Sequence, residues 1–294
     1  MAVQTSTTGE LEAASREMIA AARYTSEHNA PLINLVERFT LARGSDTLVV
    51  PKVGQMSMHK LVEGQEMTQE EDIGMTSVNV TPSEAGGKVV LTDKALRQNT
   101  NNLFTMVGKQ LGDAMARIKD EDIAALFSAL NGGTDLGAAG RTMSVTNTAR
   151  LVAHAMANKF GGQLRIVHHP NAVFAFNMGL TSVGVQTTPA GANPIPTGLS
   201  ERRLREFWTG LRMGGASVFQ DGNISVDASD DSVGAIFAPG ALGILTSVSM
   251  NRERERKPSL RGWIVYLTSD YVAFEIDDTK GAPATFDAAT PATT

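Results

Sequence analysis

The sequence contains no cysteine. This absence excludes disulfide bonds, thiolate catalysis and cysteine-based zinc sites, and it fits a reducing cytoplasm. Stability must therefore come from packing. Hydrophobic residues make up 42% of the 294 positions, which is enough to build a sizeable core in one or two domains.

An excess of basic charge is also missing. The chain has 26 lysines and arginines against 31 aspartates and glutamates, a net charge of −5. Proteins that neutralise many phosphates are usually basic, so the composition disfavours tight nucleic-acid binding. It fits a protein that must not adhere to a polyanion in its surroundings.

Long apolar runs are lacking as well. The longest, from Val233 to Leu245, is too short to span a bilayer and contains Pro239. The N-terminus has no apolar core of the kind found in signal peptides. We therefore expect a protein that is made and used in the cytoplasm, without membrane contact.

Signatures of nucleotide binding fail on inspection. Gly87-Lys88 resembles the end of a phosphate-binding loop, but Pro82 replaces its first glycine and Val89 replaces the hydroxyl residue that meets magnesium. The glycine-rich stretch 132–140 lacks the dinucleotide-binding spacing and follows an expected helix, so it is interpreted as a flexible connector.

Nucleophile and metal signatures are equally weak. His168 and His169 are adjacent in an expected strand, so their side chains face opposite sides and cannot readily chelate one ion. Ser182 lacks the flanking pattern of a hydrolase nucleophile. Consecutive acids at 70–72 are typical of a solvated loop. We expect no catalytic residue, no cofactor and no metal site, and hence a protein that is not an enzyme.

Two segments rich in β-forming residues, 46–53 and 75–81, are predicted to be strands, with Pro51 restricted to a sheet edge. The polar segment between them, 54–74, is long for a compact domain. It is either a mobile loop or a partner-contacting one. Met56, Met58 and Met67 favour contact because thioether side chains adapt to irregular surfaces.

The clearest helix signal runs from about Asn101 to Leu130, where apolar residues recur every three to four positions before an Asn-Gly-Gly stop. At about 1.5 Å per residue this helix would be roughly 45 Å long. A shorter amphipathic helix is expected at 10–23, whereas 1–9 and 281–294 are predicted to be solvated tails.

The second half of the chain predicts an α/β module. Thr146 is the expected cap of a helix, followed by a strand at 163–167 and a helix after Pro170. Residues 187–198 are predicted to form a loop, and 218–226 and 233–237 to form strands. Alternation at 263–267 and 271–274 indicates a closing antiparallel pair within 251–276.

A charged ribbon, residues 252–257, alternates arginine and glutamate. In a strand, Arg252, Arg254 and Arg256 would share one face and the glutamates the other. Two interpretations remain open. The charges either protect a solvated sheet edge from aggregation or form ion pairs between subunits.

The order of these parts resembles the tailed-phage major capsid proteins of the Hong Kong 97 fold. The most similar stretch is 78–98 (VNVTPSEAGGKVVLTDKALRQ), followed by the long helix, and 164–170 (LRIVHHP) and 252–276 are similar to the axial strand and the closing sheet. The resemblance implies an α+β fold and a structural protein that self-assembles into an icosahedral shell around double-stranded DNA. Its implied partners are further copies of the chain in pentamers and hexamers, a scaffolding protein, a portal and in some cases a decoration protein. Its location would be the virion capsid, assembled in the host cytoplasm.

The resemblance also implies a division of the chain. Residues 1–45 would form an N-terminal arm, 46–82 an extended loop, and 83–135 a peripheral domain with a spine helix. Residues 136–248 would form an axial domain, 249–280 the peripheral closing sheet, and 281–294 a C-terminal tail. The expected inter-subunit contacts are Met56, Met58, Lys60, Met67, Glu70, Glu71, Arg252, Arg254 and Arg256.

Some members of the family cross-link a loop lysine to a neighbour's asparagine. Lys52 and Lys60 lie in the corresponding segment, but no asparagine or glutamate partner aligns, so both lysines are interpreted as solvated. Two alternatives remain open. One is an encapsulin-type shell around a cargo enzyme. The other is a soluble α/β enzyme that uses 132–140 and His168.

Overall fold

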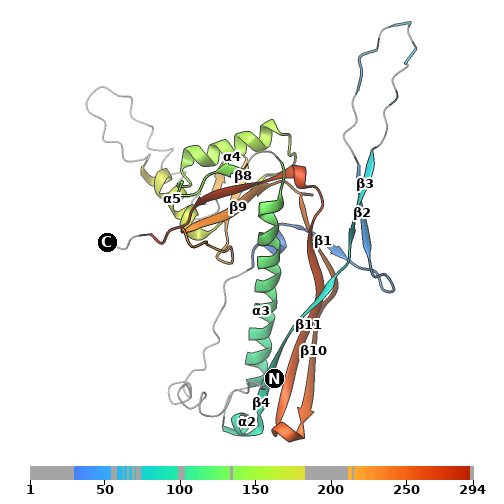
Figure 1. Ribbon diagram of the computed structural model, residues 1–294, viewed down its shortest axis with the longest axis vertical. Helices are drawn as coiled ribbons and strands as arrows, with labels where there is room; N and C mark the ends of the chain where they lie inside the picture. Colours follow the sequence, from blue (N-terminus) through green and yellow to red (C-terminus); the bar gives the residue numbers. More distant parts are fainter. Residues whose placement is uncertain are drawn as a thin grey trace.

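The computed structural model describes residues 30–53, 58–61, 63–64, 66–67, 70, 74–98, 103–132, 135–182, 211–213 and 215–291. The expected helix at 10–23 and the expected loop at 187–198 lie outside these residues. The described part contains three sheets, of four, six and two strands. It thus mixes helix and sheet as the sequence predicts (Figure 1).

The four-stranded sheet has the order β1-β10-β11-β4 and is the long lower body of the molecule (Figure 1). Its strands are β1 (Glu37–Thr40), β4 (Ser83–Thr92), β10 (Leu242–Lys257) and β11 (Gly262–Glu275). β10 pairs antiparallel with β11 and parallel with β1, and β11 pairs antiparallel with β4. The alternating segments 263–267 and 271–274 were predicted to pair with each other, which is wrong. Both belong to β11, which is longer than the typical strand.

Helix α3 (Leu103–Ala125) lies along this sheet against β11 (Figure 1). Met115, Ile123 and Phe127 are buried with Leu267 and Tyr271 of β11. The long helix is therefore confirmed, but it is shorter than predicted, because Leu126–Ala129 form the 3₁₀ helix η2. The short helix α2 (Asp93–Gln98) directly follows β4 at the lower end.

The six-stranded sheet has the order β5-β12-β9-β6-β8-β7. Its strands are β5 (Leu136–Gly137), β6 (Arg165–His168), β7 (Leu211–Met213), β8 (Ala216–Gln220), β9 (Asp231–Phe237) and β12 (Gly281–Asp287). The strand predicted at 218–226 ends earlier than expected, at Gln220, because a turn begins at Asp221.

Two helices cover one face of this sheet, α4 (Val145–Ala157) and α5 (Pro170–Ser182), and the second begins at the proline as predicted. The N-cap of α4 was predicted two residues too late. Ser144, not Thr146, is the N-cap, and its hydroxyl accepts the N–H of Asn147 at 3.2 Å. The other face packs against η2 and the 3₁₀ helix η1 (Leu32–Asn34).

Both expected chain ends require correction where the structure describes them. Residues 281–287 are not a solvated tail but strand β12, which lies between β5 and β9, and Ala282, Ala284 and Phe286 are fully buried. Within the expected arm, residues 30–41 belong to the body. Leu32 is fully buried, and β1 extends the four-stranded sheet. These segments are held by tertiary pairing rather than by an apolar period of their own.

The stretch 132–140 is likewise not a loose connector in its described residues. The N–H of Gly132 bonds the carbonyl of Gly281 at 2.6 Å, and β5 pairs with β12. Gly137 has φ +78°, and a Cβ there would lie 2.2 Å from the carbonyl oxygen of Thr285. Glycine is needed at this position because the backbone of β12 approaches so closely.

Candidate assembly surfaces

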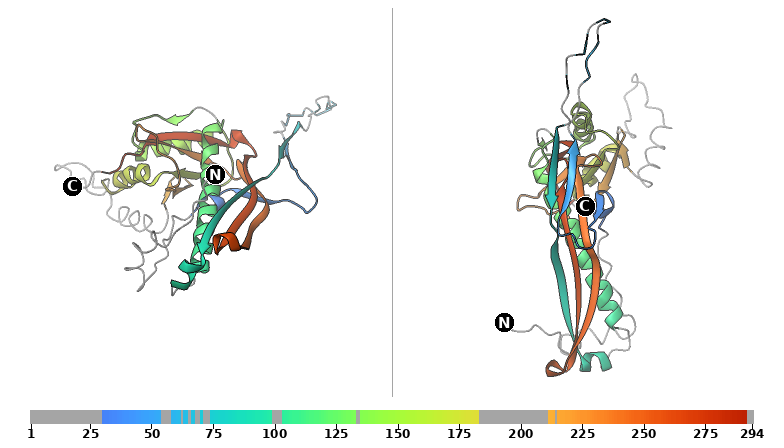
Figure 2. Two further views of the ribbon diagram at one scale, coloured as in Figure 1. Left: turned by 60° about the horizontal axis from the view of Figure 1, so that its bottom comes forward. Right: turned by 90° about the vertical axis from the view of Figure 1, so that its right-hand side faces the viewer.

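The most prominent surface is a hairpin that projects from the body (Figures 1 and 2). Its strands, β2 (Leu48–Val53) and β3 (Met75–Val80), form the two-stranded sheet at the positions predicted from sequence. They pair antiparallel with Leu48 opposite Val80 and Val53 opposite Met75. Two-stranded hairpins are marginally stable alone, so this one needs support at its root.

A small apolar cluster supplies that support. Val50 and Val80 are buried with Leu41, Leu245 and Phe274, which join the hairpin to β10 and β11. The ring of Phe274 lies 5.6 Å from that of Phe39 of β1. The root of the hairpin is therefore part of the folded body.

The opposite face of the hairpin is exposed and partly apolar. Side-chain alternation places Val49, Pro51 and Val53 on this face, opposite Asn79, Ser77 and Met75 respectively. Val49, Val53 and Met75 are each more than half exposed. An exposed apolar strand face on a projecting hairpin is typical of a surface that is covered in an assembly.

Further out, every described residue from 58 to 70 is exposed, including the predicted contact residues Met58, Lys60, Met67 and Glu70. Met58 is 94% exposed, which excludes a role in the subunit's own core. The predicted contacts Met56 and Glu71 lie outside the described residues. We call residues 54–74 the hairpin tip.

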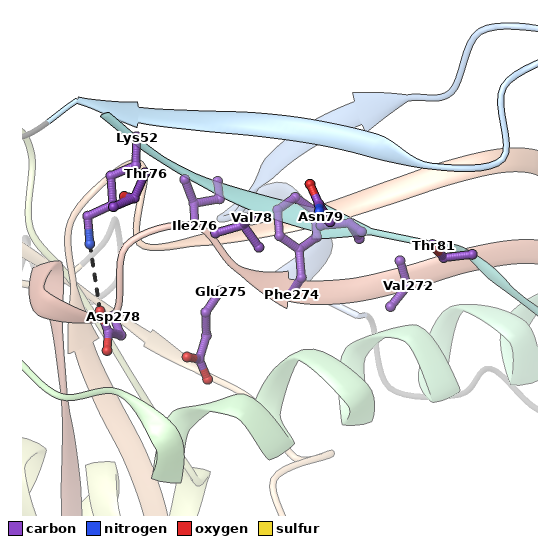
Figure 3. Close-up of a pocket in the computed structure, with 11 residues that line it drawn as sticks. Lys52, Thr76, Val78, Asn79, Thr81, Val272, Phe274, Glu275, Ile276 and Asp278 are labelled. Atoms are coloured by element: carbon purple, nitrogen blue, oxygen red, sulfur yellow. Dashed lines mark ion pairs between the residues drawn. The ribbon is translucent and has the colours of Figure 1, made fainter. Parts of the chain in front are cut away.

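A groove of about 560 Å³ lies at the hairpin root, between β3 and the end of β11 (Figure 3). Lys52 reaches across it to Asp278 at 3.8 Å, and it bonds the neighbouring Asp277 more closely, at 2.6 Å. Lys52 is thus ion-paired and only 31% exposed, whereas the sequence was interpreted as giving a solvated lysine without a partner. Its partner acids were not foreseeable, because they belong to η4 (Asp278–Lys280) and the residue before it.

The carboxylate of Asp277 is held as an anion. Burial alone would raise its pKa, but hydrogen bonds from Lys52 and Thr279 outweigh burial and lower the pKa below its ordinary value. Because the folded-state pKa is lowered, this group stabilises the fold above the unfolded-state pKa, and the contribution is lost as the pH falls further into the acid range. The pair thus fixes the hairpin to the body near neutrality.

Replacement of Lys52 by methionine should lower the free energy of unfolding by about 1–2 kcal/mol, because it leaves Asp277 largely buried with weaker compensation. Urea unfolding of Lys52→Met measures this loss. Lys60→Met is the matched control, since Lys60 is exposed at the hairpin tip, and it should change stability by less than about 0.5 kcal/mol. Equal effects of the two substitutions would show that the pair does not fix the root.

The charged ribbon forms the second candidate surface, at the lower end of β10 (Figure 1). All residues from 252 to 257 are exposed, as both interpretations require. The three arginines share a face, but that face contacts their own subunit. Arg252 donates to the carbonyl of Phe104 at 2.9 Å, and Arg254 lies over the Phe104 ring.

Arg256 is engaged in the same way. Its guanidinium forms two hydrogen bonds with the carboxylate of Asp93, at 2.9 and 3.1 Å, and lies over the Trp263 ring. The arginine face therefore helps to hold α2 and the start of α3 on the sheet. On the other side of the strand, Glu255 accepts a hydrogen bond from Tyr266. The hairpin tip and the ribbon lie at opposite ends of one subunit (Figure 1).

His168, which the catalytic alternative requires, is fully buried in the six-stranded sheet. Its Nε2 bonds the carbonyl of Ala284 at 3.1 Å, and its Nδ1 accepts the N–H of His169 at 2.9 Å. Burial lowers its pKa to about 4, so the ring is neutral. A neutral histidine with both nitrogens bonded inside the core is a packing residue.

Sequence reasoning missed a polar junction on α3, formed by residues 119–122. Lys119 is buried, and it donates to Ser269 of β11 at 2.8 Å and to the carbonyl of Ser249 at 3.3 Å. Asp122 accepts a 2.6 Å hydrogen bond from Tyr271. Four consecutive charged residues in a helix expected to pack on a sheet could have indicated a buried polar site. Their partners could not be predicted, because they are far away in sequence.

Two further classes of site were sought in the described ranges. No three histidine or acidic side chains there are grouped so that they could hold a metal ion. None of the helices in that part of the chain is long and apolar enough to cross a membrane.

The architecture matches solved shells. The capsid of the cyanophage P-SCSP1u has a TM-score of 0.64 at 14% identity, with 90% of this chain and 91% of that chain covered. The head structure of Helicobacter pylori bacteriophage KHP40 has a TM-score of 0.66 at 10% identity, with 90% and 92% covered. The SrpI encapsulin from Synechococcus elongatus PCC 7942 has a TM-score of 0.62 at 10% identity, with 100% and 99% covered. At these identities the likeness establishes the fold, which confirms the Hong Kong 97 expectation.

The sequence itself supplies the family. No curated protein matches the chain. A family model described as phage capsid protein matches residues 75–283, which is more than half of the chain and includes β3, α3 and most strands of both large sheets. The chain therefore belongs to the phage capsid protein family, as a structural major capsid protein of the Hong Kong 97 fold.

Proposed function

We propose that many copies of this chain self-assemble into an icosahedral shell that encloses double-stranded DNA. The observation that carries the proposal is the hairpin: it is fixed at its root by Lys52 and an apolar cluster, yet its outer face and tip are exposed. Exposed apolar groups that the subunit does not bury are best explained by burial against a further copy. The shell would need no catalytic residue.

Charge favours a specific arrangement of neighbours. Residues 63–72 of the hairpin tip contain five acids and no base, whereas 252–257 contain four bases and two acids. We infer that the acidic tip of one subunit lies on the basic end of β10 in another. Each exposed ion pair contributes only about 0–1 kcal/mol, so the effect would come from repetition around the shell. The three arginines contact their own subunit but stay exposed, so Arg252, Arg254 and Arg256 remain proposed contacts for the acids of a neighbour's tip. Glu70 and Glu71 are the acids proposed to meet them.

We assign the domains accordingly. The extended loop is 46–82, the four-stranded sheet with α3 is the peripheral domain, and the six-stranded sheet with α4 and α5 is the axial domain. Residues 30–41 and 281–287 join these domains instead of the arm and the tail. A scaffolding protein, a portal and a decoration protein remain proposed partners, and the host cytoplasm the proposed place of assembly.

An encapsulin-type compartment is the second candidate, because the SrpI encapsulin aligns over the whole of this chain. A phage shell and an enzyme compartment share the fold but differ in content. The acidic net charge suits a container that does not adhere to DNA, and it does not separate the two candidates.

Expression of the chain, alone and with its scaffolding partner, should give closed shells or rings of five and six subunits in the electron microscope. Raising the salt concentration from about 0.1 M to 1 M should weaken them, because it shortens the screening length from about 10 Å to 3 Å. Nucleic acid inside shells purified from infected cells would support the phage role, and a co-purifying enzyme the compartment. Monomers and dimers under all conditions would contradict both.

A further inference from the structure

A buried pair of carboxyl groups lies where α3 meets the six-stranded sheet. Asp120 projects from α3, and Asp221 directly follows β8. Both residues are fully buried. Neither contributes to the assembly surfaces described above, so their role lies within the subunit.

Asp120 connects three segments of the chain. Its Oδ1 accepts the N–H of Leu32 at 2.9 Å, and its Oδ2 accepts the side-chain amide of Asn223, also at 2.9 Å. Both oxygens of Asp120 therefore accept a hydrogen bond. The contact ties α3 to η1 on one side and to the segment after β8 on the other.

Asp221 is fixed by its own backbone. Its N–H bonds the carbonyl of His168 at the end of β6, at 3.1 Å, and its Oδ1 accepts the N–H of Asn223 at 2.9 Å. Asn223 thus donates to both carboxyl groups, which lie beside each other in the interior. Two buried carboxylates at such close range repel each other, whereas one proton on the pair lets them bond.

The surroundings favour that proton. Burial, together with the hydrogen bond that protonated Asp221 can donate to Asp120, raises the pKa of Asp221 to about 8, although the N–H of Asn223 opposes the shift. The negative charges of Asp120 and Glu121 add to the effect. The pair thus holds its proton at neutral pH.

The charged groups near the pair have partners of their own. Lys119 bonds Ser269 and the carbonyl of Ser249, and Arg117 lies 3.7 Å from Glu121. η1 has no charged side chain, and Asp122 is bonded to Tyr271 of β11. The imidazole of His168 bonds Ala284, so β6 offers only its carbonyl to Asp221.

We propose that Asp120 and Asp221 form a clasp that holds α3 against the six-stranded sheet only while the two carboxyl groups share a proton, so that deprotonation loosens this joint. When the joint opens, water reaches Asp221, which then loses its proton at an ordinary carboxyl pKa. The closed joint therefore binds one proton more than the open one between about pH 4 and 8. Over this range the ratio of closed to open joint falls about tenfold per pH unit as the pH rises, and it levels off above about 8.

Hydrogen exchange of the full chain tests the clasp. The protection of the Leu32 amide, which bonds Asp120, should fall about tenfold per pH unit from pH 6 to 8 after correction for intrinsic exchange. In Asp221→Asn the side chain can still donate to Asp120 but cannot titrate, so this protection should not depend on pH. Amides of α4 serve as the internal reference. The same pH slope in the wild type and in Asp221→Asn would overturn the proposal.

Infrared spectroscopy tests the proton directly and does not depend on Asp221→Asn folding. The wild type should show a protonated carboxyl band at pH 7 that disappears near pH 8. Glu121→Gln removes a neighbouring negative charge without touching the pair, so it should move this loss to lower pH. A wild type without the band at pH 6, or an unchanged midpoint in Glu121→Gln, would show that no shared proton holds the joint.

Discussion

Removal of residues 281–294 should leave insoluble, unfolded protein. The deletion takes away β12, and with it the fully buried Phe286 and the pairing partners of both β5 and β9. Loss of a buried phenylalanine side chain alone costs about 3–5 kcal/mol. The deletion also removes the carbonyl of Ala284, which accepts a hydrogen bond from His168. Together these losses are comparable with the roughly 5–15 kcal/mol by which a protein of this kind is stable.

A chain that ends after Ala289 is the matched control. It retains β12 and the buried Ala288, and it loses only residues beyond the strand. Circular dichroism and the soluble yield compare the two deletions. A folded, soluble chain without residues 281–294 would mean that the six-stranded sheet does not need β12.

Replacement of residues 55–72 by a short Gly/Ser linker should give the opposite result, a folded subunit that makes no stable shells. β2, β3 and the cluster at the hairpin root remain, and the described residues of the tip are exposed, so folding loses little. The linker variant lacks the apolar and acidic groups that are proposed to contact the neighbouring subunit, so assembly should fail. Thermal melting reports the fold, and electron microscopy reports the shells.

A second variant distinguishes chemistry from length. Serine in place of Met58, Leu61 and Met67 keeps the hairpin length but removes the large exposed apolar side chains among the described residues of the tip. If apolar contact matters, this variant should also assemble poorly. Shells like those of the wild type from both variants would mean that the tip plays no part in assembly, and an unfolded linker variant would assign the tip to the core.

Periodicity predicted the elements that carry their own signal. β2, β3, α3 and the start of α5 follow from apolar spacing and from a proline. β12 could not be found in this way, because GAPATFD has one large apolar residue and its burial depends on β5 and β9. Similarly, β1 is a strand because it pairs with β10, not because of its composition.

The candidate surfaces show the same division. Strand alternation correctly placed Arg252, Arg254 and Arg256 on one face, but only the fold shows that Phe104 and Asp93 lie beneath them. Lys52 was interpreted as solvated because Asp277 is distant in sequence. Sequence therefore indicates which groups share a face, whereas long-range pairing determines what that face contacts.

The pairing of β1 with β10 and of β4 with β11 has a consequence for synthesis. Both large sheets are completed by the last quarter of the sequence, since β10, β11 and β12 all begin after residue 240. Pairing between strands so distant in sequence is slow to form. The chain between them must close into a long loop, and it loses conformational entropy before any contact compensates that loss. β1, β4 and β5 leave the ribosome before their partner strands and remain prone to aggregation until those strands follow. Because of this strand order, a subunit becomes able to assemble only late in its translation. Unfinished chains therefore cannot join a growing shell.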